Sequence, residues 1–184
     1  HGPPVHYALT DYLLDLVQNS LEAGASVVRV SVSEADGRLE AAVLDNGSGM
    51  DGAEVARATD PFHTDGNKHP GRKVGLGLPF LIQALDQAGG RWDISSARGR
   101  GTDVRFWFPL DGVDTPPVGD LPGCFLSCMC FDGDYELVAA RHSPGRGSSY
   151  EVRRSDILDA VGPLSDAASI ALADAFLRSQ EEVE

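Results

Sequence analysis

Apolar residues recur at helical spacing near the start of the chain and then change to the alternation of strands. Between Thr10 and Gly24 they fall three and four positions apart, which predicts an amphipathic helix with a polar stripe. Gly24 ends this helix, and valines at alternate positions over 28–32 predict a strand with one buried face. A turn at Ala35–Gly37 and an apolar run over 39–44 complete a predicted hairpin.

A second helix and a second hairpin follow a long polar segment. Residues 46–74 carry glycines, prolines and scattered charge, with a short helical pattern over 53–58. A connection of this length inside a compact domain is usually a lid or a binding loop. Helical spacing resumes at Leu76 and stops at a glycine pair, and two alternating runs then flank a turn. These runs are 91–97 and 102–109.

The order of helix, hairpin, loop, helix and hairpin predicts an α+β fold. We expect a two-layer α/β sandwich, with the helices on one face of a mixed, mostly antiparallel sheet. Prolines and glycines over 112–123 predict a linker, because they cannot continue a central strand. The chain is therefore divided into a domain over 1–111, the linker, and a small α+β extension over 124–184.

The extension is predicted to be a three-stranded meander followed by helices. Its expected strands are 124–131, 135–141 and 150–154, and its expected helices are 156–161 and 165–181. Cys124, Cys128 and Cys130 then share one face of the first strand, either in the core or as a soft-metal site. The last helix, with Phe176 and Leu177 on an apolar side, is predicted either to cover the meander or to mediate dimerisation.

Charge and length narrow the class of protein. The 184 residues carry a formal net charge of −13, which repels a phosphate backbone and argues against nucleic acid as a partner. No apolar run reaches the roughly 18 residues of a membrane-spanning helix, and no secretory signal precedes the first helix. We expect a cytoplasmic protein that does not enter a membrane.

Four short motifs punctuate the predicted elements. Each is weak alone, since a glycine pair between apolar runs usually marks only a turn, but the four occur in order within about 90 residues. They are Asp15-Leu-Val-Gln-Asn19-Ser-Leu-Glu-Ala-Gly-Ala, Asp45-Asn-Gly-Ser-Gly-Met50, Gly75-Leu-Gly-Leu78 and Gly99-Arg-Gly-Thr102.

The order and spacing of these motifs resemble the N box and the three glycine boxes of the GHKL ATPases. This Bergerat-fold superfamily includes gyrase, the heat-shock chaperone ATPases, histidine kinases and MutL. The resemblance covers roughly residues 6–109. It implies a Bergerat-fold domain that binds ATP together with Mg²⁺.

The resemblance implies a metal ligand and a catalytic base on the first helix. The asparagine that matches Asn19 supplies an amide oxygen to Mg²⁺ in these proteins, and hard oxygen ligands suit that ion. Asp15 lies one helical turn before Asn19 and matches the general base, which is usually Glu in the hydrolytic members. Because Asp is shorter by one methylene, slow turnover, phosphotransfer and binding without turnover all stay open.

The same resemblance assigns the adenine side of the site. Asp45 matches the aspartate that accepts a hydrogen bond from the adenine amino group. Gly47 and Gly49 are expected to let the backbone pass close to the purine, where a Cβ would collide. Thr102 matches a threonine that shares the adenine-side hydrogen bonds, commonly through water.

The phosphate side is expected at the second glycine motif. Gly75, Leu76, Gly77 and Leu78 precede or open a helix, so free backbone N–H groups and the positive end of the helix dipole are expected to face the phosphates. Basic residues in the preceding loop are candidates to neutralise the triphosphate, and we single out Lys73. These basic residues are Lys68, Arg72 and Lys73.

The motifs match the superfamily without selecting one branch. Residues 16–25 look most like MutL, whereas residues 60–64 and the second glycine motif look like histidine kinases. The favoured function is an ATP-dependent conformational switch or a slow ATPase that acts on a protein partner or as a homodimer. One alternative is a single-domain serine or histidine protein kinase of the anti-sigma-factor type. The other is a scaffold that no longer binds nucleotide.

Overall fold

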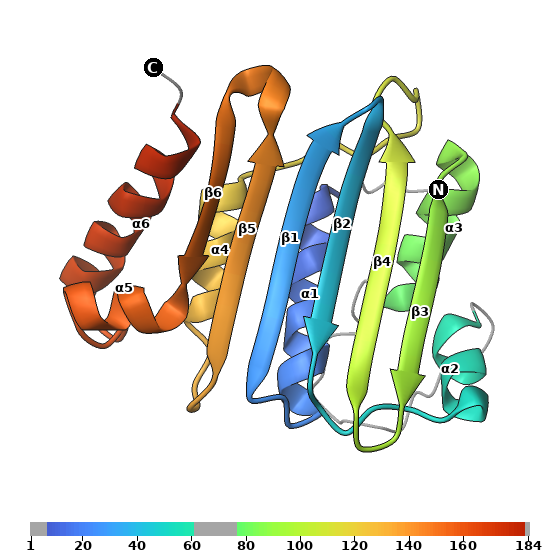
Figure 1. The fold of residues 1–184 in the computed structure, drawn as a ribbon, viewed down its shortest axis with the longest axis horizontal. Helices are drawn as coiled ribbons and strands as arrows, with labels where there is room; N and C mark the ends of the chain where they lie inside the picture. Colours follow the sequence, from blue (N-terminus) through green and yellow to red (C-terminus); the bar gives the residue numbers. More distant parts are fainter. Residues whose placement is uncertain (1–6, 61–76, 183–184) are drawn as a thin grey trace, which may run out of the picture.

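Secondary structure alternates along the chain in the computed structural model, which describes residues 7–60 and 77–182 (Figure 1). The first part contains α1 (Leu9–Glu22), β1 (Val27–Ala35), β2 (Arg38–Asp45), α2 (Gly52–Thr59), α3 (Leu78–Ala88), β3 (Arg91–Ala97) and β4 (Gly101–Pro109). The second part contains α4 (Leu121–Met129), β5 (Glu136–Ser143), the 3₁₀ turn η1 (Pro144–Arg146), β6 (Ser148–Arg153), α5 (Arg154–Val161) and α6 (Ala167–Glu181).

The strands form one six-stranded sheet in the order β3-β4-β2-β1-β5-β6. All neighbours are antiparallel except β1 and β5, which run parallel. Helices α1, α3 and α4 lie behind the sheet in Figure 1, and none of the helices in the described residues covers its other face. The predicted α+β sandwich with a mixed, mostly antiparallel sheet is therefore confirmed.

The core lies between the helices and one face of the sheet. Val28, Val30 and Val32 of β1 are at most 1% exposed, as the alternation along this strand predicts. On α1 the residues at helical spacing, such as Leu13 and Val17, are fully buried against them. Burying apolar side chains at about 25 cal/mol per Å² supplies the main force that holds these two layers together.

The turn between β1 and β2 follows the predicted chemistry. Asp36 and Gly37 both have positive φ angles, 54° and 75°, as a two-residue hairpin turn requires. Gly37 adopts this conformation without a side-chain penalty, and Asp is among the few other residues that tolerate it.

The linker contacts the first helix. The backbone N–H groups of Leu9 and Thr10, which have no partners within α1, donate to the carbonyls of Pro117 and Val118 at 2.8 and 3.1 Å. The linker therefore satisfies the N-terminal end of the helix that carries Asp15 and Asn19.

The strand expected over 124–131 is wrong. Residues Leu121–Met129 form α4, whose N-cap Asp120 accepts a hydrogen bond from the Gly123 N–H at 3.2 Å. Pro122 lies in the first turn, where a missing N–H costs nothing. A short run that is apolar on most sides carries no clear period, so its pattern could not separate a strand from a buried helix.

This correction also removes the predicted meander and the shared cysteine face. Cys124 and Cys128 lie one helical turn apart and are buried, whereas Cys130 follows the helix and is partly exposed. In the described part of the chain, no group of three His, Cys, Asp or Glu side chains is arranged to hold a metal ion.

The remaining elements of the extension join the main sheet. The two helices expected near the C-terminus are confirmed as α5 and α6. β5 pairs with β1, so the sheet runs without interruption past the linker. The division into residues 1–111, 112–123 and 124–184 stays a prediction.

Candidate functional site

Asp45 ends β2 at one edge of the sheet, and its carboxylate is held by neutral donors. The backbone N–H groups of Gly47 and Thr102 donate to Asp45 Oδ1 at 2.8 and 3.2 Å. The Ser20 hydroxyl of α1 lies 2.6 Å from Asp45 Oδ2 and donates to it. Asp45 and Thr102 are thus brought together as predicted, by cross-strand pairing of β2 with β4.

The loop after Asp45 is tied to the elements on both sides. On one side the Asn46 side-chain oxygen accepts from the N–H groups of Ser26 and Val27, both at 2.9 Å. On the other side the Gly99 N–H donates to the Ser48 carbonyl at 2.7 Å. These bonds fix residues 46–49 between the start of β1 and the β3–β4 turn.

Gly49 and Gly101 are required by close backbone approach within the protein. A Cβ at Gly49 would lie 1.9 Å from the Ala97 carbonyl oxygen, and one at Gly101 would lie 1.9 Å from that of Asp45. Gly47 is also tight, with the Ala23 carbonyl oxygen 3.0 Å from the position of a Cβ. The packing of the loop on β3, β4 and α1 thus accounts for these glycines without a purine.

A chain of hydroxyl groups continues from Thr102. Thr102 Oγ1 and Ser96 Oγ lie 2.8 Å apart, and the Met50 N–H donates to Ser96 Oγ at 2.8 Å. The Ser96 hydroxyl also lies 3.0 Å from the Gly101 carbonyl. The network links the loop after β2 to both strands of the β3–β4 hairpin.

Asp15 and Asn19 lie one turn apart on α1, and both are partly buried. The next residue, Ser20, is the one that contacts Asp45, so α1 brings Asn19 to the same edge of the sheet. Carboxylate and amide oxygens of this kind suit a hard cation such as Mg²⁺.

The N-terminal end of α3 is directed toward this edge. β3 starts at the far end of the sheet, directly after α3 ends, so α3 runs away from the site. Gly77 is the N-cap without a side-chain hydrogen bond, and Leu78 is buried. A helix start of this kind favours an anion. Lys73, Gly75 and Leu76, like Lys68 and Arg72, lie outside the described residues.

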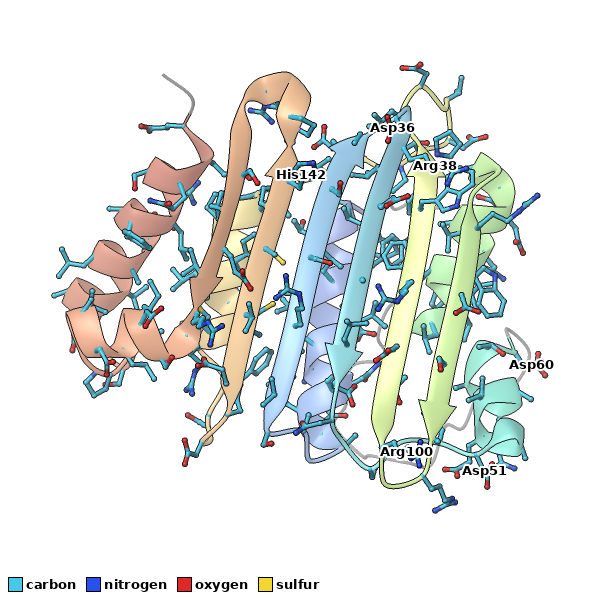
Figure 2. All side chains as sticks on the ribbon, in the orientation of Figure 1. Asp36, Arg38, Asp51, Asp60, Arg100 and His142 are labelled. Atoms are coloured by element: carbon cyan, nitrogen blue, oxygen red, sulfur yellow. The ribbon has the colours of Figure 1, made fainter. Side chains whose placement is uncertain are left out.

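The start of α2 is fixed to the β3–β4 turn at the same edge. Arg98 Nη2 lies 2.5 Å from Glu54 Oε1, and Arg98 Nε lies 3.5 Å from Asp51 Oδ2. The Glu54 N–H, which donates to Asp51, and the nearby Arg98 charge hold the pKa of Asp51 below its usual range. Figure 2 shows Asp51 and Arg100 at this edge and Asp36 at the opposite one.

Sequence reasoning gave no role to Ser20 or Ser96. Ser20 is 4% exposed on the apolar side of α1, and a hydroxyl at a core position of an amphipathic helix was a usable signal. Ser96 lies on the helix-covered side of β3, in register with Thr102. Besides its partners on β4, Ser96 accepts a hydrogen bond from Met50 in the loop after β2, a contact that no local pattern indicates.

The arrangement can receive a ligand with an amino group at one end and phosphates at the other. A carboxylate oxygen has about two lone-pair positions, so Asp45 Oδ2 can accept a second donor beside Ser20. The oxygens of Asp15 and Asn19 suit Mg²⁺, and the start of α3 suits phosphate. The described residues therefore fit Mg-ATP.

Comparison with protein families gives a match over residues 6–112 to the family described as histidine kinase-, DNA gyrase B- and HSP90-like ATPase. Sensor histidine kinase ZraS of Klebsiella oxytoca is 34% identical over 114 residues, which are 60% of this chain and 24% of that protein. ZraS of Escherichia coli is 29% identical over 113 residues, 60% of this chain and 23% of that protein. The chain spans about a quarter of the length of these relatives.

Solved structures give a weaker likeness. The catalytic domain of histidine kinase ThkA matches with a TM-score of 0.40 and 22% identity over 52% of this chain and 61% of that one. The histidine kinase domain of the E. coli osmosensor EnvZ matches with a TM-score of 0.38 and 22% identity, over 53% of this chain and 61% of that one.

Among residues 7–60 and 77–182, no helix is both long and apolar enough to cross a membrane.

Proposed function

The chain belongs to the histidine kinase-, DNA gyrase B- and HSP90-like ATPase family, and we propose that it binds Mg-ATP at the Asp45 edge of the sheet and hydrolyses it slowly. The observation that carries this proposal is the Asp45 carboxylate, oriented by Ser20, Gly47 and Thr102 with acceptor capacity left on Oδ2. A carboxylate held only by neutral donors keeps its charge for a ligand.

The adenine amino group donates to Asp45 in this proposal. Guanine presents a carbonyl oxygen at the corresponding position, so an acceptor-only carboxylate rejects it. The bonds that fix the loop after β2 keep Asp45 in one orientation before the ligand arrives, and this lowers the entropy cost of binding.

The triphosphate extends toward α1 and the start of α3. Asn19 is the metal ligand of this chain, and the metal supplies charge neutralisation to the phosphates when it is bound. Asp15 accepts a proton from water while the water oxygen bonds to the γ-phosphorus, and the bond from that phosphorus to the bridging oxygen breaks. ADP and phosphate are the products. The shorter reach of Asp is the reason to expect slow turnover.

Phosphotransfer is the second candidate, and the names of the matched relatives favour it. Both ZraS proteins are sensor histidine kinases. In this version a protein side chain replaces water as the nucleophile at the γ-phosphorus. In either version, the use of ATP changes how the chain interacts with a protein partner. We also propose that the protein is cytoplasmic.

Calorimetric titration with Mg-ATP and Mg-GTP tests the site. Asp45→Asn is expected to weaken ATP binding between about 10- and 100-fold, the range for a hydrogen bond to a charged group. Asp103→Asn is the matched control, because Asp103 follows Thr102 on β4 and belongs to the sheet face without helices. Equal ATP affinity in wild type and Asp45→Asn, with both folded, is the result that contradicts the proposed site.

Assays of phosphate release and of protein labelling with γ-labelled ATP distinguish hydrolysis from phosphotransfer. They use wild type and a separate Asp15→Asn variant. Loss of a general base is expected to lower phosphate release about 100-fold or more while ATP still binds. If the label of the γ-phosphate is instead found on protein and no free phosphate is released, the result supports phosphotransfer. If no ATP binds at millimolar concentration, the result supports the alternative that the protein is a scaffold that no longer binds nucleotide.

A further inference from the structure

Asp45, Thr102 and Ser96 form a row across the end of the sheet. Thr102 on β4 is the cross-strand neighbour of Asp45 on β2 and of Ser96 on β3. Directly paired residues point to the same face of a sheet, and Val104, two residues after Thr102, is buried in the core. The row therefore faces the helix-covered side, and Ser96 is the member that no sequence motif includes.

The hydrogen bonds of Ser96 use every position that its hydroxyl offers. A serine hydroxyl has one hydrogen to donate and two lone-pair positions that accept. The hydrogen goes to the Gly101 carbonyl oxygen at 3.0 Å, because a carbonyl only accepts. The Met50 N–H donates to the first lone-pair position at 2.8 Å. Thr102 Oγ1 also lies 2.8 Å away, and only the second lone-pair position is left for it. Thr102 is therefore the donor in this contact.

This direction of donation decides what Thr102 presents to a ligand. Its hydroxyl hydrogen points at Ser96, and Oγ1 forms no other hydrogen bond within the described part of the chain. Thr102 is thus left with acceptor positions, like the ionised carboxylate of Asp45 beside it. A ligand group that contacts both residues must donate hydrogen bonds.

We propose that Ser96 is a positioning residue that selects adenine by holding the Thr102 hydroxyl as an acceptor. The assignment deepens the proposed ATP site and rests on it. The adenine amino group has two hydrogens, so it can donate to Asp45 and, directly or through one water, to Thr102. Hypoxanthine, the base of ITP, has a carbonyl oxygen at this position. That oxygen meets two acceptors and no donor, and ITP is disfavoured.

The partners of Ser96 are backbone groups in a closely packed part of the site. Gly101 lies so near Asp45 that a Cβ on it would be 1.9 Å from the Asp45 carbonyl oxygen. The loop before Met50 is tied by hydrogen bonds to the start of β1 and to the β3–β4 turn. Backbone groups held in this way keep one pattern of donor and acceptor around Ser96. The Thr102 hydrogen is therefore directed before a nucleotide binds, which lowers the cost of binding.

Calorimetric titrations with Mg-ATP and Mg-ITP test the role of Ser96. Ser96→Ala leaves the Thr102 hydroxyl free to turn and donate to the hypoxanthine oxygen. We expect the preference for ATP over ITP to fall about 10-fold, within the range for one neutral hydrogen bond. Loss of packing alone weakens both nucleotides equally and leaves the preference unchanged. Ser95→Ala is the matched control, because Ser95 is exposed on the opposite face of β3, paired with Asp103, and it is expected to behave like wild type.

Two milder variants keep the test independent of a folding defect. Ser96→Thr retains the hydroxyl and is expected to retain the preference for ATP. Ser96→Cys retains the size of the side chain, but a thiol is a weak donor and a weak acceptor. Its preference for ATP is expected to lie between those of wild type and Ser96→Ala.

A double-mutant cycle shows whether Ser96 acts through Thr102. Thr102→Val removes the hydroxyl at nearly constant shape, and in this background Ser96→Ala is expected to change the preference no further. If the preference is unchanged in Ser96→Ala, or falls equally with Thr102→Val present, while Asp45→Asn still weakens ATP binding, the role of Ser96 is overturned and the proposed site stands. A wild type that binds neither nucleotide overturns the proposed site and the role of Ser96 together.

Discussion

Two polar clusters occupy opposite ends of the sheet and are built in different ways. At the end of β2, Asp45 is held by two backbone N–H groups and the Ser20 hydroxyl. Toward the β1–β2 turn, the Arg141 side chain is 1% exposed and lies 2.5 Å from Glu34 and 3.3 Å from Glu181. One charge is fixed by neutral groups, and the other is met by opposite charges.

This difference separates a site from a structural tie. Among the described residues Asp45 forms no ion pair, so its negative charge is oriented but not neutralised, as a ligand contact requires. Arg141 is neutralised by carboxylates of β1 and α6, which fixes the C-terminal helix to the centre of the sheet. Burial and the adjacent Glu181 raise the pKa of Tyr150 beside them.

Arg141→Met is expected to cause the largest loss of stability of the changes considered. It leaves two largely buried carboxylates without a cation, and removal of one partner from a buried pair costs about 3 kcal/mol in the free energy of unfolding. Urea unfolding measures this loss. Adding Glu34→Gln and Glu181→Gln to Arg141→Met is expected to recover most of it, because no unpaired charge stays buried.

Arg29→Met is the matched control on the same sheet. Arg29 Nη1 lies 2.6 Å from Glu151 Oε1, but the two side chains are 43% and 47% exposed. Water screens this pair, so its removal is expected to change stability far less. Equal losses for Arg29→Met and Arg141→Met would show that burial does not set the difference between the clusters.

Ser20→Ala probes the neutral cluster and is expected to have a medium effect. It removes the shortest hydrogen bond to Asp45 and leaves a partly buried acceptor unsatisfied, which costs about 1 to 2 kcal/mol. ATP affinity is expected to fall as well, because Asp45 loses one of the contacts that orient it. Urea unfolding and calorimetry of the same variant measure both effects.

Ser48→Ala is the control for Ser20→Ala, because Ser48 lies in the loop directly after Asp45 and its hydrogen bonds with Ala23 and Gly99 use backbone atoms. It is expected to bind ATP like wild type. A Ser20→Ala protein that loses stability but keeps full ATP affinity would assign Ser20 to packing alone.

The cluster around Asp45 could largely be predicted from the sequence, whereas the cluster around Arg141 could not. Asp45 and Thr102 belong to short motifs at strand ends, and the strands that bring them together follow directly from alternation and turn residues. Ser20 was missed because its role depends on which way α1 faces. Whether Asp15 and Asn19 act on ATP stays a prediction.

The charged cluster depends on contacts that no local pattern encodes. Arg141 and Glu34 are separated by 107 residues, and they meet because β5 pairs in parallel with β1 and not with β4, the strand that precedes it in the sequence. The incorrect prediction of a strand over 124–131 also prevented the prediction of this arrangement. The segment forms α4, the helix that connects β4 to β5. Parallel pairing across a helix is set by the packing of layers and not by the alternation within each strand.

Asp120→Asn is expected to have the smallest effect of the three, at most about half that of Ser20→Ala, because its ion pair with Arg178 is exposed. The hydrogen bonds from Arg178 first, and then that from the Gly123 N–H, hold the pKa of Asp120 below its usual range. A depressed folded-state pKa stabilises above the unfolded value of about 3.9, and this contribution is lost as the pH falls through the lower folded value. The stability difference between wild type and Asp120→Asn is therefore expected to be full at neutral pH and to vanish in acid, since Asn still caps α4. Urea unfolding along this pH series measures it, and a difference that persists in strong acid would mean that a weaker cap of α4, and not the lost charge, causes the effect.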